Sequence, residues 1–168
     1  MRLLKSSLSP DLDHIQAEIY IPAGLVLTHE RIDTESQMYD ACSFELNGLN
    51  ILHRTAKITP AKNGQFVTIW KRDTKGQTTP FSLSDGFHFF VITVREGVQL
   101  GQFVFPSAVL ASKGILASPH QEGKRGIRVY PPWVMPSSKQ AEKTQHWQIA
   151  HFLTVGQDTL ARWVRAFH

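Results

Sequence analysis

The sequence predicts an α+β fold in which a mixed central β-sheet of about five strands is flanked by helices at both ends of the chain. Three observations lead to this prediction. Apolar residues recur with helical spacing near both termini, they alternate with polar residues in the middle, and two later runs are almost wholly apolar. Because 168 residues suffice for one hydrophobic core, we expect a single domain over residues 1–168.

The first expected element is a short amphipathic helix. Ser9 can cap its N-terminus, and Pro10 suits its first turn. Its apolar stripe consists of residues at helical spacing, namely Leu12, Ile15 and Ile19. The proline and glycine in residues 22–24 end this helix. The polar residues 30–40 that follow show no clear period, so they fit a second short helix or a loop.

Strands are expected through the middle of the chain. Residues 42–46 alternate between apolar and polar, and Asn47-Gly48 predicts a tight hairpin turn into a returning strand over residues 49–58. Residues 65–72 are rich in β-branched and aromatic side chains, which favour a strand. Two further apolar runs predict interior strands that are covered on both faces, at residues 88–95 and 102–105.

Helices and one long loop are expected in the last third. Pro106 opens a short helix that ends near Gly114. Residues 120–133 are expected to form a loop, and residues 139–153 a long helix with a serine placed to cap it. Residues 157–167 are expected to be a frayed tail.

Charge is distributed unevenly along the sequence. The net charge is +4, but residues 1–45 contain three basic and eight acidic residues, a net charge of −5, whereas residues 46–168 contain fifteen and six, a net charge of +9. Such a basic surplus raises the local concentration of polyanions. Two interpretations remain open: the basic part forms an anion-binding face, or the acidic N-terminal part folds over it and neutralises it.

Several classes of protein are excluded. No apolar run approaches the ~20 residues that cross a bilayer, and Met1 to Pro10 has no secretory signal, so we expect a cytoplasmic location and no membrane insertion. The single cysteine, Cys42, is expected to be a buried, inert thiol. The common nucleotide, serine-hydrolase and zinc motifs are missing, and His146 and His151 do not share a helical face. We therefore expect no metal and no cofactor.

A candidate nucleic-acid site follows from cations that lie close to aromatic residues. In residues 120–133, Lys and Arg alternate with Gly before Tyr130 and Trp133, a mixture that binds phosphates by charge and bases by stacking worth ~1 to 3 kcal/mol per base. The alternative is that the rings belong to the core and the cations to solvated edges. The candidate residues are Lys57, Lys62, Lys71, Arg72, Lys124, Arg125, Arg128, Tyr130, Trp133, Lys143 and Gln148.

Five long motifs occur in order between residues 44 and 153: RTAKITPAKNGQFVTIWKR (54–72), FFVITVR (89–95), GQFVFP (101–106), GKRGIRVYPPW (123–133) and QAEKTQHWQ (140–148). In these motifs the chain resembles the MepB family. The resemblance implies a small bacterial cytoplasmic protein, in a family of which one member is encoded beside a multidrug efflux pump and its repressor. It also implies a fold like the restriction-endonuclease PD-(D/E)XK core, and hence an ancestral link to nucleic acid.

The sequence contains only part of the residue set that nuclease chemistry in that fold requires. It needs two or three carboxylates and a lysine around Mg²⁺. The strand that ends in Lys71 has no acid two residues before the lysine, and in the strands and turns of the basic region only Glu45 and Asp85 are suitable carboxylates. The sequence thus predicts a degenerate active site without catalytic residues.

The leading functional hypothesis is a noncatalytic nucleic-acid-binding protein that prefers single-stranded DNA or RNA to duplex DNA. No recognition helix is evident for a major groove, and stacking requires unpaired bases. One alternative is a Mg²⁺-dependent nuclease that uses Glu45, Asp85 and Lys71. Another is a module that binds a small ligand or a protein and is linked to multidrug efflux; the sequence identifies no protein partner.

Overall fold

The structure is a computed structural model that describes residues 9–168. Most of the stretch from Met1 to Pro10, on which the expectation of no secretory signal rests, lies outside the described residues. Across residues 9–168, no helix combines the length and the apolar character that crossing a bilayer requires.

A six-stranded sheet forms the centre of the fold, in the order β1-β2-β3-β8-β9-β11. Its strands are β1 (Leu27–Ile32), β2 (Cys42–Leu46), β3 (Leu49–Thr55), β8 (Phe89–Glu96), β9 (Gln99–Pro106) and β11 (Phe152–Thr154). All neighbours pair antiparallel except β3 and β8, which are parallel. The α+β fold with a mixed central sheet is therefore confirmed, with six strands in place of about five.

The turn between β2 and β3 shows why the hairpin signal was reliable. Asn47 and Gly48 both have positive φ, at 50° and 82°, which is the backbone that a two-residue hairpin turn requires. Leu46 then pairs with Leu49 and Cys42 with His53 along the ladder. The predicted hairpin is confirmed.

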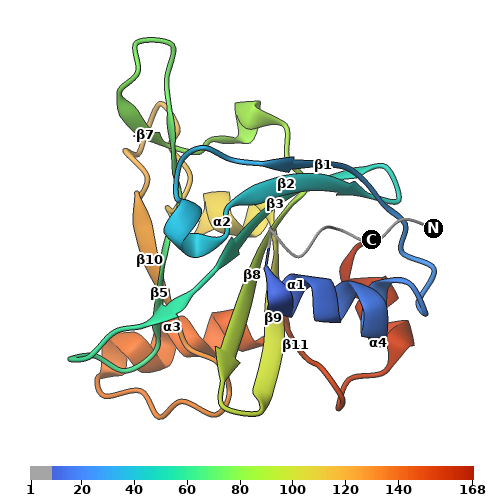
Figure 1. The fold of residues 1–168 in the computed structure, drawn as a ribbon. Coiled ribbons are helices and arrows are strands. Elements are labelled where there is room, and N and C mark those ends of the chain that lie inside the picture. Colours follow the sequence, from blue (N-terminus) through green and yellow to red (C-terminus); the bar gives the residue numbers. More distant parts are fainter. Residues whose placement is uncertain (1–8) are drawn as a thin grey trace.

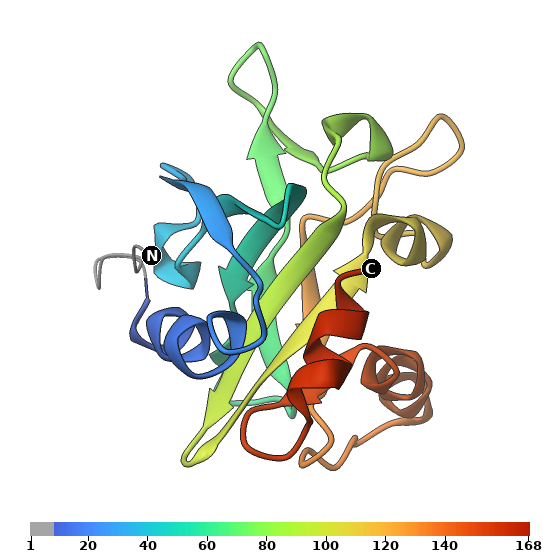
Figure 2. The same cartoon turned by 90° about the vertical axis from the view of Figure 1, so that its right-hand side faces the viewer.

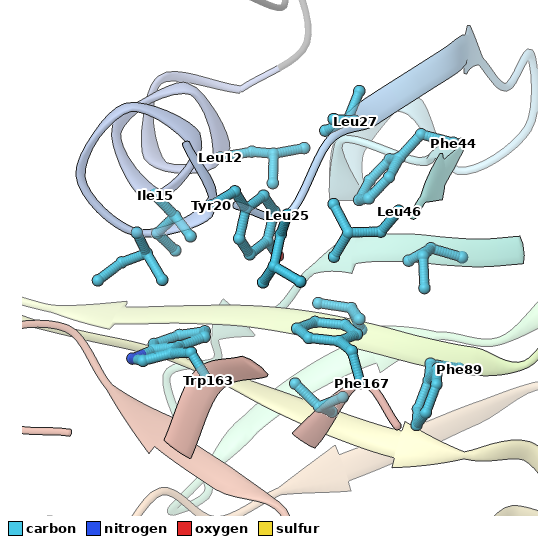
Figure 3. Close-up of a cluster of buried hydrophobic side chains, with 14 of the residues drawn as sticks. Leu12, Ile15, Tyr20, Leu25, Leu27, Phe44, Leu46, Phe89, Trp163 and Phe167 are labelled. Carbon is cyan, nitrogen blue, oxygen red and sulfur yellow. The ribbon is translucent and has the colours of Figure 1, made fainter. Parts of the chain in front are cut away.

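One face of the sheet is covered by helices from the two ends of the chain (Figure 1). These are α1 (Pro10–Ile15), its π-helical continuation η1 (Gln16–Tyr20), and α4 (Leu160–Ala166). Ser9 caps α1 by accepting a hydrogen bond from the Leu12 amide at 3.2 Å, as expected. Figure 3 shows the core that these helices close, in which Tyr20 lies against Trp163 and Phe167.

The other face is covered by a three-stranded sheet and two helices, and a two-stranded sheet extends beyond them (Figure 1). One sheet has the order β10-β5-β4, and the other pairs β6 with β7. Their bounds are β4 (Lys57–Ile58), β5 (Gln65–Thr68), β6 (Trp70–Arg72), β7 (Thr78–Pro80) and β10 (Gly126–Val129), and the helices are α2 (Ser107–Ser112) and α3 (Lys139–Ile149). Short 3₁₀ turns are η2 (Gln37–Tyr39) and η3 (Leu83–Asp85). Because β8 has core on both sides, its predicted interior position is confirmed.

Several predicted boundaries are wrong because tertiary pairing overrides the local pattern. Residues 49–58 and 65–72 each divide into strands of two different sheets, and at the second division the Ile69 amide donates to the Arg125 carbonyl at 2.9 Å. Residues 120–133 contain strand β10, and the long helix stops at residue 149 so that Leu153 joins β11. The expected frayed tail is helix α4, anchored by the fully buried Trp163.

A row of buried polar side chains crosses the sheet. The Tyr20 hydroxyl donates to Gln102 Oε1 at 2.6 Å, and Gln102 Nε2 donates to Thr93 Oγ1 at 3.0 Å. Thr93 Oγ1 lies 2.8 Å from His53 Nε2, and His53 Nδ1 lies 3.3 Å from the Asp40 carbonyl and 3.6 Å from Cys42 Sγ. A neutral His53 protonated on Nδ1 satisfies this row, because Nε2 then accepts from the Thr93 hydroxyl. Burial also raises the pKa of Cys42 to about 12, in agreement with the inert thiol that we expect.

Acid should destabilise the fold through His53. Burial lowers the pKa of its imidazole from 6.5 to about 4, so the unfolded chain binds a proton there more readily than the folded chain does. The stability that the neutral ring contributes is therefore complete above about pH 6.5 and is lost as the pH falls towards 4, by up to about 3 kcal/mol. Urea unfolding of the wild type and of His53→Gln over this range measures the effect, which should be smaller in the variant. Equal pH dependence in both proteins would contradict the assignment.

Candidate nucleic-acid interface

A pocket of about 480 Å³ lies between β10, the segment after α2, and α3. Figure 2 shows α2 and α3 on the same side of the molecule, next to β9. The lining of this pocket combines cations, aromatic rings and uncharged polar groups. They include Lys113, Lys124, Arg128, Tyr130, Ser138, Thr144, Trp147 and Gln148. The volume lies within the ~300 to 1,000 Å³ that small-molecule sites occupy.

Gln148 builds the wall between β10 and α3. Its Oε1 accepts the Tyr130 amide at 2.8 Å, and its Nε2 donates to the Arg128 carbonyl at 3.0 Å. The side chain is 1% exposed, so both of its polar ends are used inside the protein. The expectation that Gln148 contacts nucleic acid directly is corrected: it positions the β10 edge that lines the pocket.

The pocket has a one-sided charge. Lys113, Lys124 and Arg128 line it, and the lining residues found within 9–168 include no Asp or Glu. The Lys113 ammonium lies 5.4 Å from the centre of the Trp147 ring, a distance at which cation–π attraction holds. Three cations that converge without a carboxylate make a site that favours anions over neutral ligands.

Positive charge continues from the pocket onto the outer face of the β10-β5-β4 sheet. Arg128 and Lys57 both pair in register with Phe66, on either side of it. The Arg128 guanidinium lies 5.9 Å from the Phe66 ring and donates to the Asn63 carbonyl and to Thr59 Oγ1. We call the set formed by Lys57, Lys113, Lys124 and Arg128 the basic face.

The aromatic residues that we predicted for stacking differ in their surroundings. The half-buried Tyr130 lines the pocket and packs on Gly64, where an added Cβ would lie 2.8 Å from the ring. Trp133 instead packs edge-on against Phe152 at 5.6 Å and donates its indole N–H to Glu96 at 3.3 Å. Trp133 therefore belongs to the edge of the core, and Tyr130 is the predicted ring that the structure places at the basic face.

Other predicted cations are paired elsewhere. Arg72 lies 3.3 Å from Glu35 and stacks on Trp70, whereas Lys71 forms an ion pair with Asp85. Arg125 contacts Thr78 and Glu122. Lys62 and Lys143 are exposed but do not line the pocket.

The acidic N-terminal segment thus neutralises some cations and leaves others. Glu35 pairs with Arg72, Asp33 lies 3.6 Å from the buried Arg54, and Asp11 pairs with Arg95 at 2.7 Å. None of these carboxylates lines the pocket beside α3. The acidic segment therefore neutralises part of the basic surplus, and anion binding by the remaining cations stays a prediction.

Sequence reasoning missed Lys113 and Trp147. Lys113 stands alone next to Gly114 at the end of α2, far in sequence from the other cations. Trp147 shares one face of α3 with Gln140, Thr144 and Gln148, and that spacing was the only signal for it. The signal was too weak to choose between core and pocket.

A second pocket, of about 330 Å³, brings together residues from the nuclease alternative. Glu45 and Asp85 both line it, and Lys71 pairs with Asp85. Asp85 Oδ2 also accepts the Ser82 amide at 2.8 Å, and Glu45 lies 3.0 Å from His29 Nδ1. Among residues 9–168, no group of three or more His, Cys, Asp or Glu side chains is arranged to hold a metal ion.

The fold and the site define a small α+β protein with a basic pocket between a short strand and a helix, in which the lining from residues 9–168 contains no Asp or Glu. The chain belongs to the MepB-like family, whose model matches residues 33–154. A solved structure, the crystal structure of MepB, superposes with a TM-score of 0.76 at 33% identity, covering 79% of this chain and 89% of that one. The predicted family is confirmed.

A second solved structure, the bacterial homing endonuclease I-Ssp6803I, aligns with a TM-score of 0.43 at 16% identity over 84% of this chain and 93% of that one. This score is too low to support a shared fold or a shared activity. Comparison with curated proteins gives no match.

Proposed function

We propose that this protein binds nucleic acid through the basic face and the pocket beside α3. The observation that carries the proposal is the convergence of Lys113, Lys124 and Arg128 on a pocket lined by no carboxylate of the described chain. Lysine and arginine side chains supply most of the affinity for a phosphate backbone, because each contact releases counterions. Family membership is consistent with this function but does not define it.

Single-stranded DNA or RNA is the substrate class that the pocket suits. Tyr130 and Trp147 line it beside the cations, and unpaired bases can stack on such rings whatever their sequence. Duplex DNA stacks the faces of its bases inside the helix, and α3, which is held to β10 by Gln148, contains no Arg or Asn for reading base edges in a major groove. We infer no catalytic step at this pocket, because no Asp or Glu of residues 9–168 lines it to bind a metal ion or to act as a base.

Fluorescence anisotropy with a labelled oligonucleotide tests the proposal. Single strands and a duplex of about 12 nucleotides are titrated at about 50 and 200 mM salt. If four cations of the basic face each neutralise a phosphate, single-strand affinity should fall about 50-fold between these concentrations. The duplex should bind more weakly at both. No binding at low salt, or an affinity independent of salt, would contradict the proposal.

A metal-dependent nuclease is the second candidate, and the shared pocket of Glu45 and Asp85 favours it. The Lys71 ammonium beside Asp85 could stabilise charge on a cleaved phosphate. Incubation of labelled oligonucleotides with Mg²⁺ or Mn²⁺ tests it. Cleavage by the wild type that is lost in Asp85→Ala would establish this activity, whereas intact substrate throughout removes it.

A further inference from the structure

A third pocket, of about 270 Å³, lies where α3 ends and α4 packs against β9. It is lined by both arginines of α4, Arg162 and Arg165, together with His151 and the end of β9 at Val104 and Pro106. No residue of its described lining is acidic. It is thus a second acid-free basic pocket, distinct in its residues from the one beside Lys124.

The charge of this pocket comes from the arginines. Burial lowers the pKa of His151, which leaves its ring neutral near pH 7. Arg162 pairs with Asp158, whose other carboxylate oxygen accepts the Thr154 amide at 2.6 Å. Arg165 is exposed, and no ion pair or hydrogen bond of its guanidinium is found within residues 9–168. Arg165 is therefore the group that is available to an anion.

The two basic pockets lie close together along α3, because Trp147 and Gln148 line the first and Ala150 and His151 line the other. The centre of the buried Phe105 ring lies 5.3 Å from the centre of the Trp147 ring, which lines the pocket beside Lys124. It lies 5.9 Å from the centre of the His151 ring, which lines the Arg165 pocket. Helix α2 begins directly after Pro106, which lines the Arg165 pocket, and is followed by Lys113, which lines the pocket beside Lys124. Figure 2 shows the three helices α2, α3 and α4 on one side of the molecule.

We propose that the pocket at Arg165 binds further phosphates of the same single strand that occupies the basic face. This inference rests on the proposed function and adds the path of the ligand: from Lys124 and Lys113, past the end of α3, to α4. A polynucleotide fits better than a single nucleotide, because the two pockets have separate cationic groups and lie at opposite ends of the short helix α2. The strand length needed for full affinity should therefore exceed what the first pocket alone can hold.

The proposed path is tested by measuring how the salt dependence of the binding affinity changes with oligonucleotide length. Labelled dT oligonucleotides of about 4 to 16 nucleotides are titrated into the wild type, Arg165→Ala and Lys75→Ala. Lys75 is a matched control, because it is an exposed cation in the loop between β6 and β7 and lines neither pocket. In the wild type, the slope of log K against log salt should steepen with length by about 0.7 for each added phosphate contact.

Arg165→Ala should remove about 0.7 from that slope and lower affinity about 3- to 10-fold for the long oligonucleotides only. Lys75→Ala should match the wild type at every length. If Arg165→Ala binds long strands as the wild type does while Lys124→Glu weakens them, the extended path is wrong and the proposed function stands. If the wild type binds no oligonucleotide, the proposed function itself fails.

Discussion

Reversing two charges at the pocket beside α3 is expected to lower single-strand affinity by one to two orders of magnitude. The variant Lys113→Glu/Lys124→Glu replaces two of the four cations of the basic face by carboxylates. Two phosphate contacts are lost, and two carboxylates now repel the phosphates. The slope of log K against log salt should therefore be about half that of the wild type or flatter. Anisotropy titrations of the wild type and the variant with one labelled single strand, at two ionic strengths, measure both quantities.

A control variant must separate the effect of the protein's net charge from the effect of where the reversed charges lie. Lys75→Glu/Arg31→Glu changes the net charge equally at exposed sites outside the pocket. It should keep most of the affinity, with a modest loss through the overall field. Equal losses in the two double variants would show that total charge, and not this pocket, governs binding. Lys113 and Lys124 are exposed, so the substitutions should leave the fold intact.

Gln148→Leu is expected to reduce the free energy of unfolding by about 2 to 4 kcal/mol. It leaves the Tyr130 amide and the Arg128 carbonyl without the partners that they have in the folded chain. Each buried group stranded in this way costs about 1 to 3 kcal/mol, whereas leucine keeps a similar volume. For a protein of this size, the midpoint temperature of thermal unfolding, Tm, should fall by roughly 5 to 15 °C.

The matched control for this prediction is Gln140→Leu. Gln140 lines the same pocket but is exposed at the start of α3, so its loss should change stability by no more than about 0.5 kcal/mol. Calorimetry or circular dichroism measures both variants. A Gln148→Leu protein as stable as the control would mean that the amide does not hold β10 to the helix.

Local signals predicted the parts of the fold that depend on neighbours in sequence. Asn47-Gly48 specified a hairpin because few other residues adopt positive φ twice in succession. The β-branched and aromatic composition of residues 65–72 predicted strand structure there, but not the division of the run between two sheets. That division depends on a hydrogen bond from Ile69 to Arg125, fifty-six residues later in the chain.

The site could be predicted only in part, for a similar reason. Lys124, Arg128 and Tyr130 were found because they lie together in one motif. Lys113 joins them only when the segment after α2 lies beside Lys124, whose amide donates to the Ile115 carbonyl. Gln148 changes from a possible ligand to a structural residue because α3 lies along the strand edge. Trp133 looked equivalent to Tyr130 in sequence, and only the contact with Phe152 shows that it packs in the core.

Photochemical cross-linking tests the central claim most directly. A single-stranded oligonucleotide that carries a photoreactive pyrimidine is irradiated with the wild-type protein, and the attached peptide is mapped by mass spectrometry. Attachment within residues 124–148, which contain Tyr130 and Trp147, is the predicted result. Attachment confined to Trp70 or Tyr39, or spread evenly over the surface, would contradict the claim that unpaired bases occupy this pocket.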